Sequence, residues 1–336
     1  MKGLAGNKRT FIIAEAGVNH NGSEAIAEQL VAAAADAGAD AIKFQTFKAA
    51  DGVSRFAERA SYQKHEVGGP ESQLEMVRKL ELPFDAFGRL KARCERLGIQ
   101  FLTTAFDLGS VAYVESLDLP MLKVPSGELT NLPLLRKIDE CHKPVLMSTG
   151  MATRDEIAAA ISVLKHSDIT LLHCTTEYPC PFDSVNLKAI QTLRDTFGLP
   201  VGYSDHTSGI EIPIAAVALG ACCIEKHFTL DRGMVGPDHR ASIEPQDLAR
   251  MVKAIRNLEM AMGDGIKKPE RAEIKNIMIV RKSIVARRRI AKGEVFTDEN
   301  LAAKRPGTGI SPMEWDRIVG MRANKDYEED EQICGV

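Results

Sequence analysis

The sequence predicts an α/β fold, a (β/α)8 barrel followed by a small β-rich domain, and three observations support this fold class. Between Thr10 and about Thr229, eight short apolar and β-branched runs alternate with longer, alanine-rich amphipathic stretches, the pattern of βα units around a parallel sheet. The glycine-rich phosphate turn that usually follows the first strand of an open doubly wound sheet is absent from the chain. At 336 residues, the chain is also longer than the ~250 residues typical of one barrel.

Each of the eight runs predicts one strand. The helix expected between the first two strands has Ser23 at its N-cap position and Gly38 as its C-terminal stop. The segment from Lys48 to Glu81 is the one long insertion, and its polarity allows either an ordered active-site loop or a mobile one. The predicted strands begin at Thr10, Asp40, Ile99, Met121, Pro144, Ile169, Pro200 and Cys222.

The composition and the residue pattern change after the last predicted helix, which starts at Pro245. A charged stretch begins at Asp264, and β-rich sequence with turn signals at Lys292-Gly293 and Pro306-Gly307 follows it. We therefore expect a barrel domain over residues 1–265, a linker over 266–280 and a small domain over 281–336.

Composition and charge narrow the classes of function. Hydrophobic residues make up 44% of the chain and charged residues 26%, an ordinary globular balance. A formal net charge of −3 argues against nucleic acid or an anionic membrane as partner, so any anion must be bound by a local site. The seven cysteines include no CxxC pair, which argues against a disulfide framework or a zinc knuckle. The chain also lacks a long apolar segment, which predicts a cytoplasmic protein.

Two lysines are expected to point into the barrel. Alternation along their strands turns Lys43 and Lys123 inward, while their apolar neighbours face the helices. Burying a lysine costs several kcal/mol unless a counter-ion is present, so a Lys–Glu pair inside the barrel is one interpretation. The alternative is a cradle for a phosphate and a carboxylate. Hydroxyl groups on neighbouring strand ends favour the cradle, and they belong to Thr104, Ser126, Ser148 and Ser204.

Two histidines close the last two predicted strands. Neighbouring strands lie about 4.8 Å apart, so His206 and His227 can reach one divalent ion. Two protein ligands leave coordination positions open, which suits a Lewis acid better than a structural zinc ion. Each histidine alone would more often be a hydrogen-bonded core residue. For His20, His173 and His239 we expect either that structural role or a role in supporting the residues of the site without contacting a ligand.

Two carboxylates, Glu15 and Glu128, end the first and fourth runs and face the same mouth as the lysines. A carboxylate there can orient a lysine or move a proton, and ion pairing alone explains each one equally well. The pair Cys222-Cys223 indicates packing in the last strand, because no nucleophile motif surrounds it.

Nine motifs, in order over nearly the whole chain, resemble those of the sialic acid synthase family. The C-terminal segment resembles the antifreeze-like (SAF) domain that follows the barrel in these synthases. Family members are transferases that condense phosphoenolpyruvate with an N-acylated mannosamine-type sugar, releasing phosphate and forming a nine-carbon 2-keto acid. The motifs are AEAGVNHNG, AIKFQTF, KVPSGE, STGMAT, HCTTEYP, GYSDHTSG, EKHFTLDR, GPDHRAS and KRPGTGISP.

The resemblance implies roles for individual residues. His206 and His227 would bind the metal, usually Mn2+, with Mg2+ or Co2+ as alternatives, and Glu15 or Glu128 would assist the water that adds to the donor. The small domain would cap the barrel of the partner subunit, which implies a domain-swapped homodimer. The acceptor sugar would contact Tyr178, Asp238 and Arg305. Phosphoenolpyruvate would be held by Lys43, Gln45, Thr104, Lys123, Ser126, Ser148, Thr176 and Ser204.

The identity of the acceptor has two interpretations. The first is an N-acetylneuraminate synthase that uses open-chain N-acetylmannosamine. The alternative is an N,N'-diacetyllegionaminate synthase that uses 2,4-diacetamido-2,4,6-trideoxymannose, because HCTTEYP also resembles the loop of those synthases and Thr176 replaces an Asn found in some sialic acid synthases. That loop weakens a pseudaminate version.

Two further interpretations lie outside this chemistry. A metal-dependent barrel hydrolase could use the two histidines, but it gives no role to two inward lysines. An ice- or carbohydrate-binding module does not explain the polar strand ends of the barrel.

Overall fold

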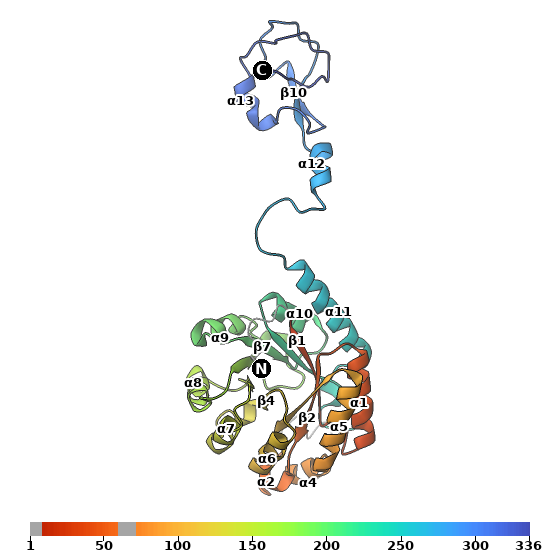
Figure 1. The fold of residues 1–336 in the computed structure, drawn as a ribbon, viewed down its shortest axis with the longest axis vertical. Coiled ribbons are helices and arrows are strands. Elements are labelled where there is room, and N and C mark those ends of the chain that lie inside the picture. The colour runs from red at the N-terminus through yellow and green to blue at the C-terminus, as the bar shows by residue number, and fades with distance from the viewer. Residues whose placement is uncertain (1–8, 60–71) are drawn as a thin grey trace. The chain divides into compact units, whose positions relative to one another are not determined.

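The computed structural model describes residues 9–59 and 72–336. The chain divides into two compact units, Met1–Gly263 and Asp264–Val336, and each is described here by itself. Figure 1 names their helices and strands.

The first unit is a closed barrel of eight parallel strands in sequential order, which confirms the predicted fold class. The barrel closes where β1 pairs with β8, and in this register Glu15 lies opposite both Lys43 and His227. The strands are β1 (Phe11–Gly17), β2 (Ala41–Thr46), β3 (Gln100–Ala105), β4 (Leu122–Val124), β5 (Val145–Ser148), β6 (Ile169–His173), β7 (Val201–Asp205) and β8 (Cys223–His227).

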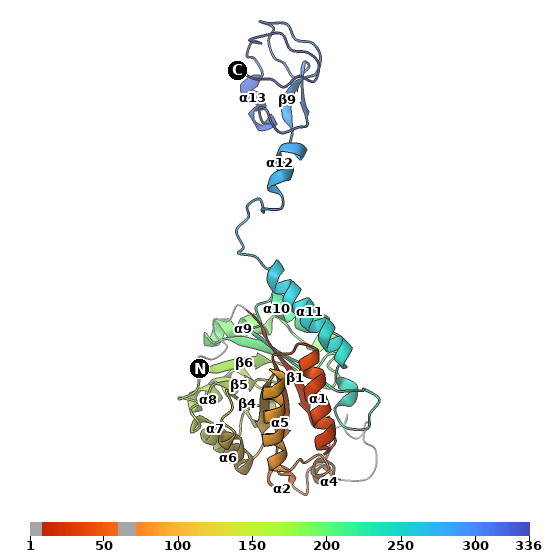
Figure 2. The same ribbon diagram turned by 45° about the vertical axis from the view of Figure 1, so that its right-hand side comes forward.

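Helices that follow the strands cover the outside of the barrel. The predicted cap of the first helix is confirmed, because Ser23 Oγ accepts a hydrogen bond from Ile26 N, and Gly38 has a φ of +81° just after the helix ends. Figures 1 and 2 both show α1 beside α5, where Arg89 of α5 forms an ion pair with Glu24 of α1. The covering helices are α1 (Glu24–Asp36), α5 (Phe84–Leu97), α6 (Leu108–Ser116), α7 (Leu132–Asp139), α8 (Arg154–Val163), α9 (Ala189–Phe197), α10 (Glu211–Ala218) and α11 (Pro245–Ala261).

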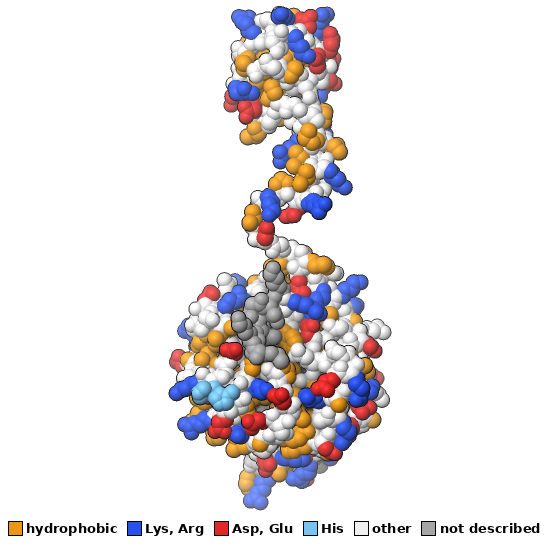
Figure 3. Space-filling model, viewed as in Figure 1, with side chains coloured by type: hydrophobic (Ala, Val, Ile, Leu, Met, Phe, Trp, Pro, Cys, Tyr) orange, Lys and Arg blue, Asp and Glu red, His pale blue; other side chains and the backbone are white. Residues whose placement is uncertain are grey.

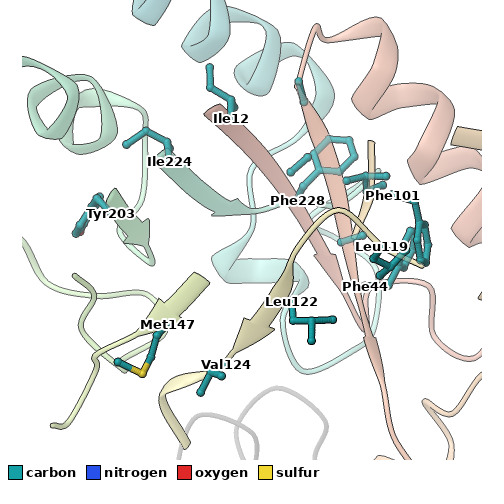
Figure 4. Close-up of a cluster of buried hydrophobic side chains, with 14 of the residues drawn as sticks. Ile12, Phe44, Phe101, Leu119, Leu122, Val124, Met147, Tyr203, Ile224 and Phe228 are labelled. Carbon is teal, nitrogen blue, oxygen red and sulfur yellow. The ribbon is translucent and has the colours of Figure 1, made fainter. Parts of the chain in front are cut away.

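The main hydrophobic core lies between the strands and these helices. Ile42, Phe44 and Val124, which flank the inward lysines in sequence, are completely buried in it. Figure 4 shows side chains of this layer on several strands. Burial of one such side chain stabilises the fold by about 1.5–3 kcal/mol, so the apolar neighbours fix the direction in which Lys43 and Lys123 point.

The inside of the barrel changes from apolar to polar along the strands. On β1, Ile13 in the apolar layer is followed two residues later by Glu15, and on β8 Cys223 is followed by Glu225. Side chains two residues apart share a face of a strand, so the polar groups lie directly above an apolar plug. The plug consists of Ile13, Ala41, Leu102, Leu146, Leu172 and Cys223. Cys223 thus packs inside the barrel, as the sequence analysis expected for this strand.

In its described residues, 48–59 and 72–81, the insertion from Lys48 to Glu81 forms two short helices, α2 (Ala49–Gly52) and α4 (Gln73–Arg78). Ser72 and Glu75 form a capping box at the start of α4. The middle of the insertion, residues 60–71, lies outside the described residues.

The second unit has its own small core. It contains α12 (Ile274–Val280), the antiparallel pair β9 (Ser283–Ala286) and β10 (Leu301–Lys304), and α13 (Trp315–Ile318). Phe296 and Tyr327 are completely buried there and their rings meet edge to face. The predicted turn at Lys292-Gly293 is present, with a φ of +83° at the glycine.

Charged side chains of both signs are interspersed over the visible face of the barrel unit (Figure 3). Within the described part of the chain, no helix is both long enough and apolar enough to cross a bilayer.

Candidate active site

A cavity of about 330 Å³ opens at the carboxyl ends of the barrel strands. This volume lies in the range of cavities that hold small ligands. The lining belongs to the barrel unit and includes each barrel residue that the sequence predicted for the site. These residues are Glu15, Lys43, Gln45, Thr104, Lys123, Ser126, Glu128, Ser148, Thr176, Tyr178, Ser204, His206, His227 and Asp238.

Lys43 is buried at the floor of the cavity. Its Nζ lies 2.6 Å from Glu15 Oε2 and 3.7 Å from Glu225 Oε2, and it donates a hydrogen bond to Thr104 Oγ1 at 3.0 Å. Burial alone would lower the pKa of this lysine, but the two carboxylates outweigh burial and raise it. The Lys–Glu pair considered from the sequence is therefore present, and the same lysine lines the cavity.

Lys123 is held differently. Its Nζ donates to Ser148 Oγ at 2.6 Å and to Val124 O at 3.3 Å, while Glu225 Oε1 lies 3.9 Å away. Burial lowers the pKa of Lys123, and the single distant carboxylate does not offset that effect. A negatively charged ligand near Nζ would therefore improve the electrostatic environment of this lysine.

Glu225 is a member of the site that the sequence analysis missed. It accepts a hydrogen bond from Ser204 Oγ at 3.1 Å and lies within 4 Å of both lysines. Burial would raise the pKa of this carboxyl group, but Lys123 and Lys43 hold it below its ordinary value. Alternation gave a signal that could have found it, because Glu225 lies two residues before His227 on the same strand.

Glu15 differs from Glu225 in its protonation. Burial and the neighbouring charge of Glu225 outweigh the effect of Lys43 and raise the pKa of Glu15 to about 7. Near neutral pH the floor therefore holds two ammonium groups, one ionised carboxylate and one carboxyl group that is only partly ionised. This excess of positive charge suits an anionic ligand.

Glu128 has a different environment from Glu15. It is only partly buried, in the 3-10 turn Ser126–Glu128, and its carboxylate accepts a hydrogen bond from Asn131 Nδ2 at 2.6 Å. Of the two predicted carboxylates, only Glu15 forms an ion pair with a floor lysine.

Hydroxyl groups crowd around Gly150. Ser126 Oγ accepts a hydrogen bond from Gly150 N at 3.0 Å. A Cβ atom at residue 150 would lie 2.3 Å from Thr176 Oγ1 and 2.8 Å from Ser126 Oγ. Only glycine lets these two hydroxyl groups lie on the same side of the cavity.

The two imidazoles lie together above β7 and β8, with ring centroids 5.4 Å apart. His206 Nδ1 lies 2.6 Å from the carbonyl oxygen of Thr175, to which it donates in the neutral tautomer. Burial lowers the pKa of both histidines, so both rings keep a lone pair. His227 Nδ1 is buried without a hydrogen-bond partner, and Asp238 Oδ2 lies 3.8 Å from it. Neutral imidazoles and an unpartnered nitrogen are what a divalent metal requires of its ligands.

The described residues contain no group of three or more His, Cys, Asp or Glu side chains placed to hold a metal ion. The histidine pair would therefore leave most coordination positions to water or substrate. The ring of Tyr178 packs against both imidazoles, with centroid distances of 4.2 Å to His206 and 5.3 Å to His227.

The three histidines expected to be structural do not line the cavity. His20 is fully buried beside Phe44. His173 Nε2 meets the carbonyl oxygen of Val185 at 2.8 Å, and His239 Nδ1 meets a threonine hydroxyl at 2.7 Å.

A second buried ion pair supports the strands that carry the imidazoles, and the sequence analysis missed it too. Lys226 pairs with Asp205, both fully buried, and donates to Thr207 O at 2.7 Å. Asp205 also accepts a hydrogen bond from Tyr203 Oη at 3.1 Å. The pair joins β7 to β8 next to His206 and His227.

Arg305 is the one predicted site residue that belongs to the second unit. Its side chain is exposed, and its Nε donates to Val280 O at 3.0 Å.

Comparisons with known proteins assign the chain to a family. The model of the NeuB family matches residues 30–267, and the model of the SAF domain matches residues 281–334. The chain is 55% identical to the N,N'-diacetyllegionaminic acid synthase of Campylobacter jejuni, over 97% of this chain and 99% of that relative. It is 48% identical to the enzyme of the same name from Legionella pneumophila, over 93% of this chain and 90% of that relative.

A solved structure resembles the chain in the same way. The N-acetylneuraminic acid synthetase of Leptospira borgpetersenii, a complex with citrate, has a TM-score of 0.71 and 36% identity, over 80% of this chain and 90% of that one. The family model covers most of the chain and the named relatives cover nearly all of it. The chain therefore belongs to the NeuB family and is an enzyme of the synthase class, with a SAF domain after its barrel.

Proposed function

We propose that this enzyme is an N,N'-diacetyllegionaminate synthase. It would condense phosphoenolpyruvate with 2,4-diacetamido-2,4,6-trideoxymannose and water, and release phosphate. The similarity to two synthases of that name, at 55% and 48% identity against 36% for the N-acetylneuraminic acid synthetase, carries the choice of acceptor. It favours the alternative from the sequence analysis over N-acetylmannosamine.

The charged floor supports phosphoenolpyruvate as the donor. Lys43 and Lys123 would neutralise its carboxylate and phosphate, and a net positive floor favours such a dianion or trianion. Hydroxyl and amide groups around the lysines would orient the donor and hold its C3 towards the acceptor. These groups belong to Gln45, Thr104, Ser126, Ser148, Thr176 and Ser204.

His206 and His227 would hold a divalent metal, which we propose to be Mn2+, with Mg2+ or Co2+ as alternatives. The neutral rings and the unpartnered Nδ1 of His227 fit this assignment. When bound, such an ion supplies Lewis acidity that makes the acceptor aldehyde more electrophilic.

Glu15 is the better of the two carboxylates for handling the water proton. The donor C3 forms a bond to the aldehyde carbon, the aldehyde oxygen takes a proton, and water adds to the donor C2. The C–O bond to phosphate then breaks and leaves a keto group at C2. A base with a pKa near 7, as Glu15 has, is matched to accepting the water proton at neutral pH.

Tyr178 and Asp238 would contact the acceptor beside the imidazoles. We further propose that a homodimer completes the site, with the small domain of one copy supplying Arg305 to the N-acyl group of an acceptor in the barrel of the other. The exposure of Arg305 supports this role.

The test is a phosphate-release assay with phosphoenolpyruvate and Mn2+. The kcat/KM for 2,4-diacetamido-2,4,6-trideoxymannose should exceed that for N-acetylmannosamine by at least about tenfold. A preference for N-acetylmannosamine would overturn the proposed acceptor, and metal-dependent hydrolysis without phosphoenolpyruvate would favour a hydrolase.

A single substitution tests separately whether the histidine pair holds the metal. His206→Ala should abolish metal-dependent phosphate release while the protein keeps its circular dichroism spectrum, because the barrel does not depend on this ring for its core. Full activity of the variant would remove the assignment.

A further inference from the structure

One side of the cavity is an apolar surface that the proposed chemistry does not use. Val18, Phe47 and Leu80 are buried there, with Val77 and Phe106 packed against them. This cluster is separate from the main core, and all five side chains line the cavity. We call these five residues the apolar wall.

The apolar wall stands just above the polar floor. Val18, Phe47 and Phe106 are each the first residue after a strand, on β1, β2 and β3 respectively. The two phenylalanine rings meet edge to face at 6.3 Å. Val77 lies in α4 and Leu80 lies two residues after that helix ends, so the insertion contributes two of the five side chains.

The position of the wall limits which part of an acceptor it can meet. The lysines on β2 and β4 bind the donor, and the imidazoles follow β7 and β8, so the reacting aldehyde carbon must lie near these groups. The opposite end of a six-carbon acceptor is C6. C6 is therefore the part of the acceptor farthest from the reacting carbon, and the wall is an apolar part of the lining that the lysines and imidazoles leave free.

From this geometry we propose that the apolar wall is a specificity subsite for the C6 methyl group of a 6-deoxy acceptor. The proposal rests on the proposed function and assigns the residues that select the acceptor at C6. A C6 hydroxyl group would lose its water against these five side chains, none of which offers a hydrogen-bonding atom. Apolar pockets distinguish groups of this size by roughly 10- to 100-fold.

An acetamido methyl group fits the wall less well. It brings an N–H and a C=O group that need partners when buried. Two polar residues that line the cavity are close to the wall in sequence, Lys48 next to Phe47 and Gln73 in the helix of Val77. Lys48 already lies 3.5 Å from Glu81 and over the ring of Phe84.

Near-isosteric substitutions in the full-length enzyme test the subsite. Val18→Thr and Val77→Thr each add one hydroxyl group to the wall with little change in volume. The acceptors are N-acetylmannosamine and its 6-deoxy analogue, which differ by a single hydroxyl group. Wild-type enzyme should prefer the 6-deoxy compound by roughly 10- to 100-fold in kcat/KM, and each variant should reduce that preference by about three- to tenfold.

Val111→Thr is the matched control. Val111 is a buried valine of α6 in the main core and does not line the cavity. This variant should lose thermal stability as the wall variants do, but keep the wild-type preference. A second pair of acceptors, with and without a 4-acetamido group and both carrying a C6 hydroxyl, should show an unchanged ratio in all variants.

The outcomes separate this proposal from the proposed function. An enzyme that prefers the diacetamido acceptor but does not discriminate at C6, or whose C6 preference is unchanged in both wall variants, overturns the subsite alone. A shift confined to the 4-acetamido pair also overturns the C6 assignment. An enzyme that prefers N-acetylmannosamine to the diacetamido acceptor, yet shows the predicted C6 shift, overturns the proposed function alone.

Discussion

At the scale of single residues, the buried charge of Lys123 lowers the stability of the free protein, and the binding of an anionic ligand explains why the site keeps it. Lys123 is buried with one strong hydrogen bond to Ser148 and no close carboxylate. A buried cation in such surroundings destabilises the free protein. Functional sites keep groups of this kind because the ligand supplies the missing partner.

Lys123→Met tests this interpretation. The substitution keeps most of the side-chain volume and removes the charge, so kcat/KM for phosphoenolpyruvate should fall by at least about 100-fold. Thermal stability should stay the same or rise, because Lys43 still pairs with Glu225. A loss of stability without loss of activity would contradict a role in donor binding.

His20 predicts a pH dependence of stability. Burial, with a smaller effect of the charge of His239, lowers the pKa of His20 from about 6.5 to about 4. Between these values the unfolded chain binds a proton that the folded chain does not, so stability is complete above pH 6.5 and is lost as the pH falls towards 4. At pH 5 this one residue should cost about 2 kcal/mol relative to pH 7.

Urea unfolding of wild type and His20→Asn at pH 5 and pH 7 measures this effect. Asparagine can still accept the hydrogen bond that Gly22 N gives to His20 Nδ1, but it does not titrate. The variant should lose about 2 kcal/mol less than wild type between the two pH values. Equal losses would show that other groups control acid stability.

At the scale of secondary-structure elements, strands β7 and β8 are joined by side chains on both of their faces. Inside the barrel Ser204 binds Glu225, and outside it Asp205 binds Lys226. The inner pair faces the cavity and the outer pair is packed away from it. Lys226 is therefore a structural buried lysine, in contrast to Lys123.

Lys226→Met should destabilise the protein by about 3–5 kcal/mol, because Asp205 would remain buried without its cation. Denaturant unfolding measures the loss. The double variant Asp205→Asn with Lys226→Met should recover part of the stability, since it removes the unpaired charge. A single variant that loses less than about 1 kcal/mol would show that water reaches Asp205.

Strands β7 and β8 also show what the sequence alone could and could not predict. Alternation in CIEKH indicates that Glu225 and Lys226 face opposite sides of the strand, and the inward direction of Lys43 and Lys123 follows from the same rule. Alternation does not reveal which residue stands opposite on the next strand. The partner of Lys226 is Asp205, which only the register between β7 and β8 brings into contact. The apolar wall escaped prediction for a similar reason, because α4 joins it from a distant part of the sequence.

At the scale of the whole molecule, the two units have separate cores, and each is expected to fold around its own. The sequence analysis expected a linker after residue 265, from the charged stretch that begins at Asp264 and the turn signals beyond it. It could not place Arg305 against any partner, because exposure and charge do not specify a neighbour.

A truncated chain that ends at Val280 tests whether the barrel folds without the small domain and whether that domain contributes to acceptor binding. The barrel should keep its cooperative unfolding transition, because no residue of its core is removed. The KM for the acceptor should rise by about tenfold or more through the loss of the charge-assisted hydrogen bonds proposed for Arg305. Sedimentation of both chains would test the proposed dimer. An unchanged acceptor KM would contradict the proposed role of Arg305.

The apolar plug beneath the polar floor also bears on the order in which the substrates bind. It fills the interior of the barrel beneath the lysines, so a ligand on the floor is expected to enter from the carboxyl ends of the strands. An acceptor bound nearer the opening would then lie over a donor held by Lys43 and Lys123. With phosphoenolpyruvate on the lysines as proposed, we expect an ordered reaction in which the donor binds before the acceptor sugar.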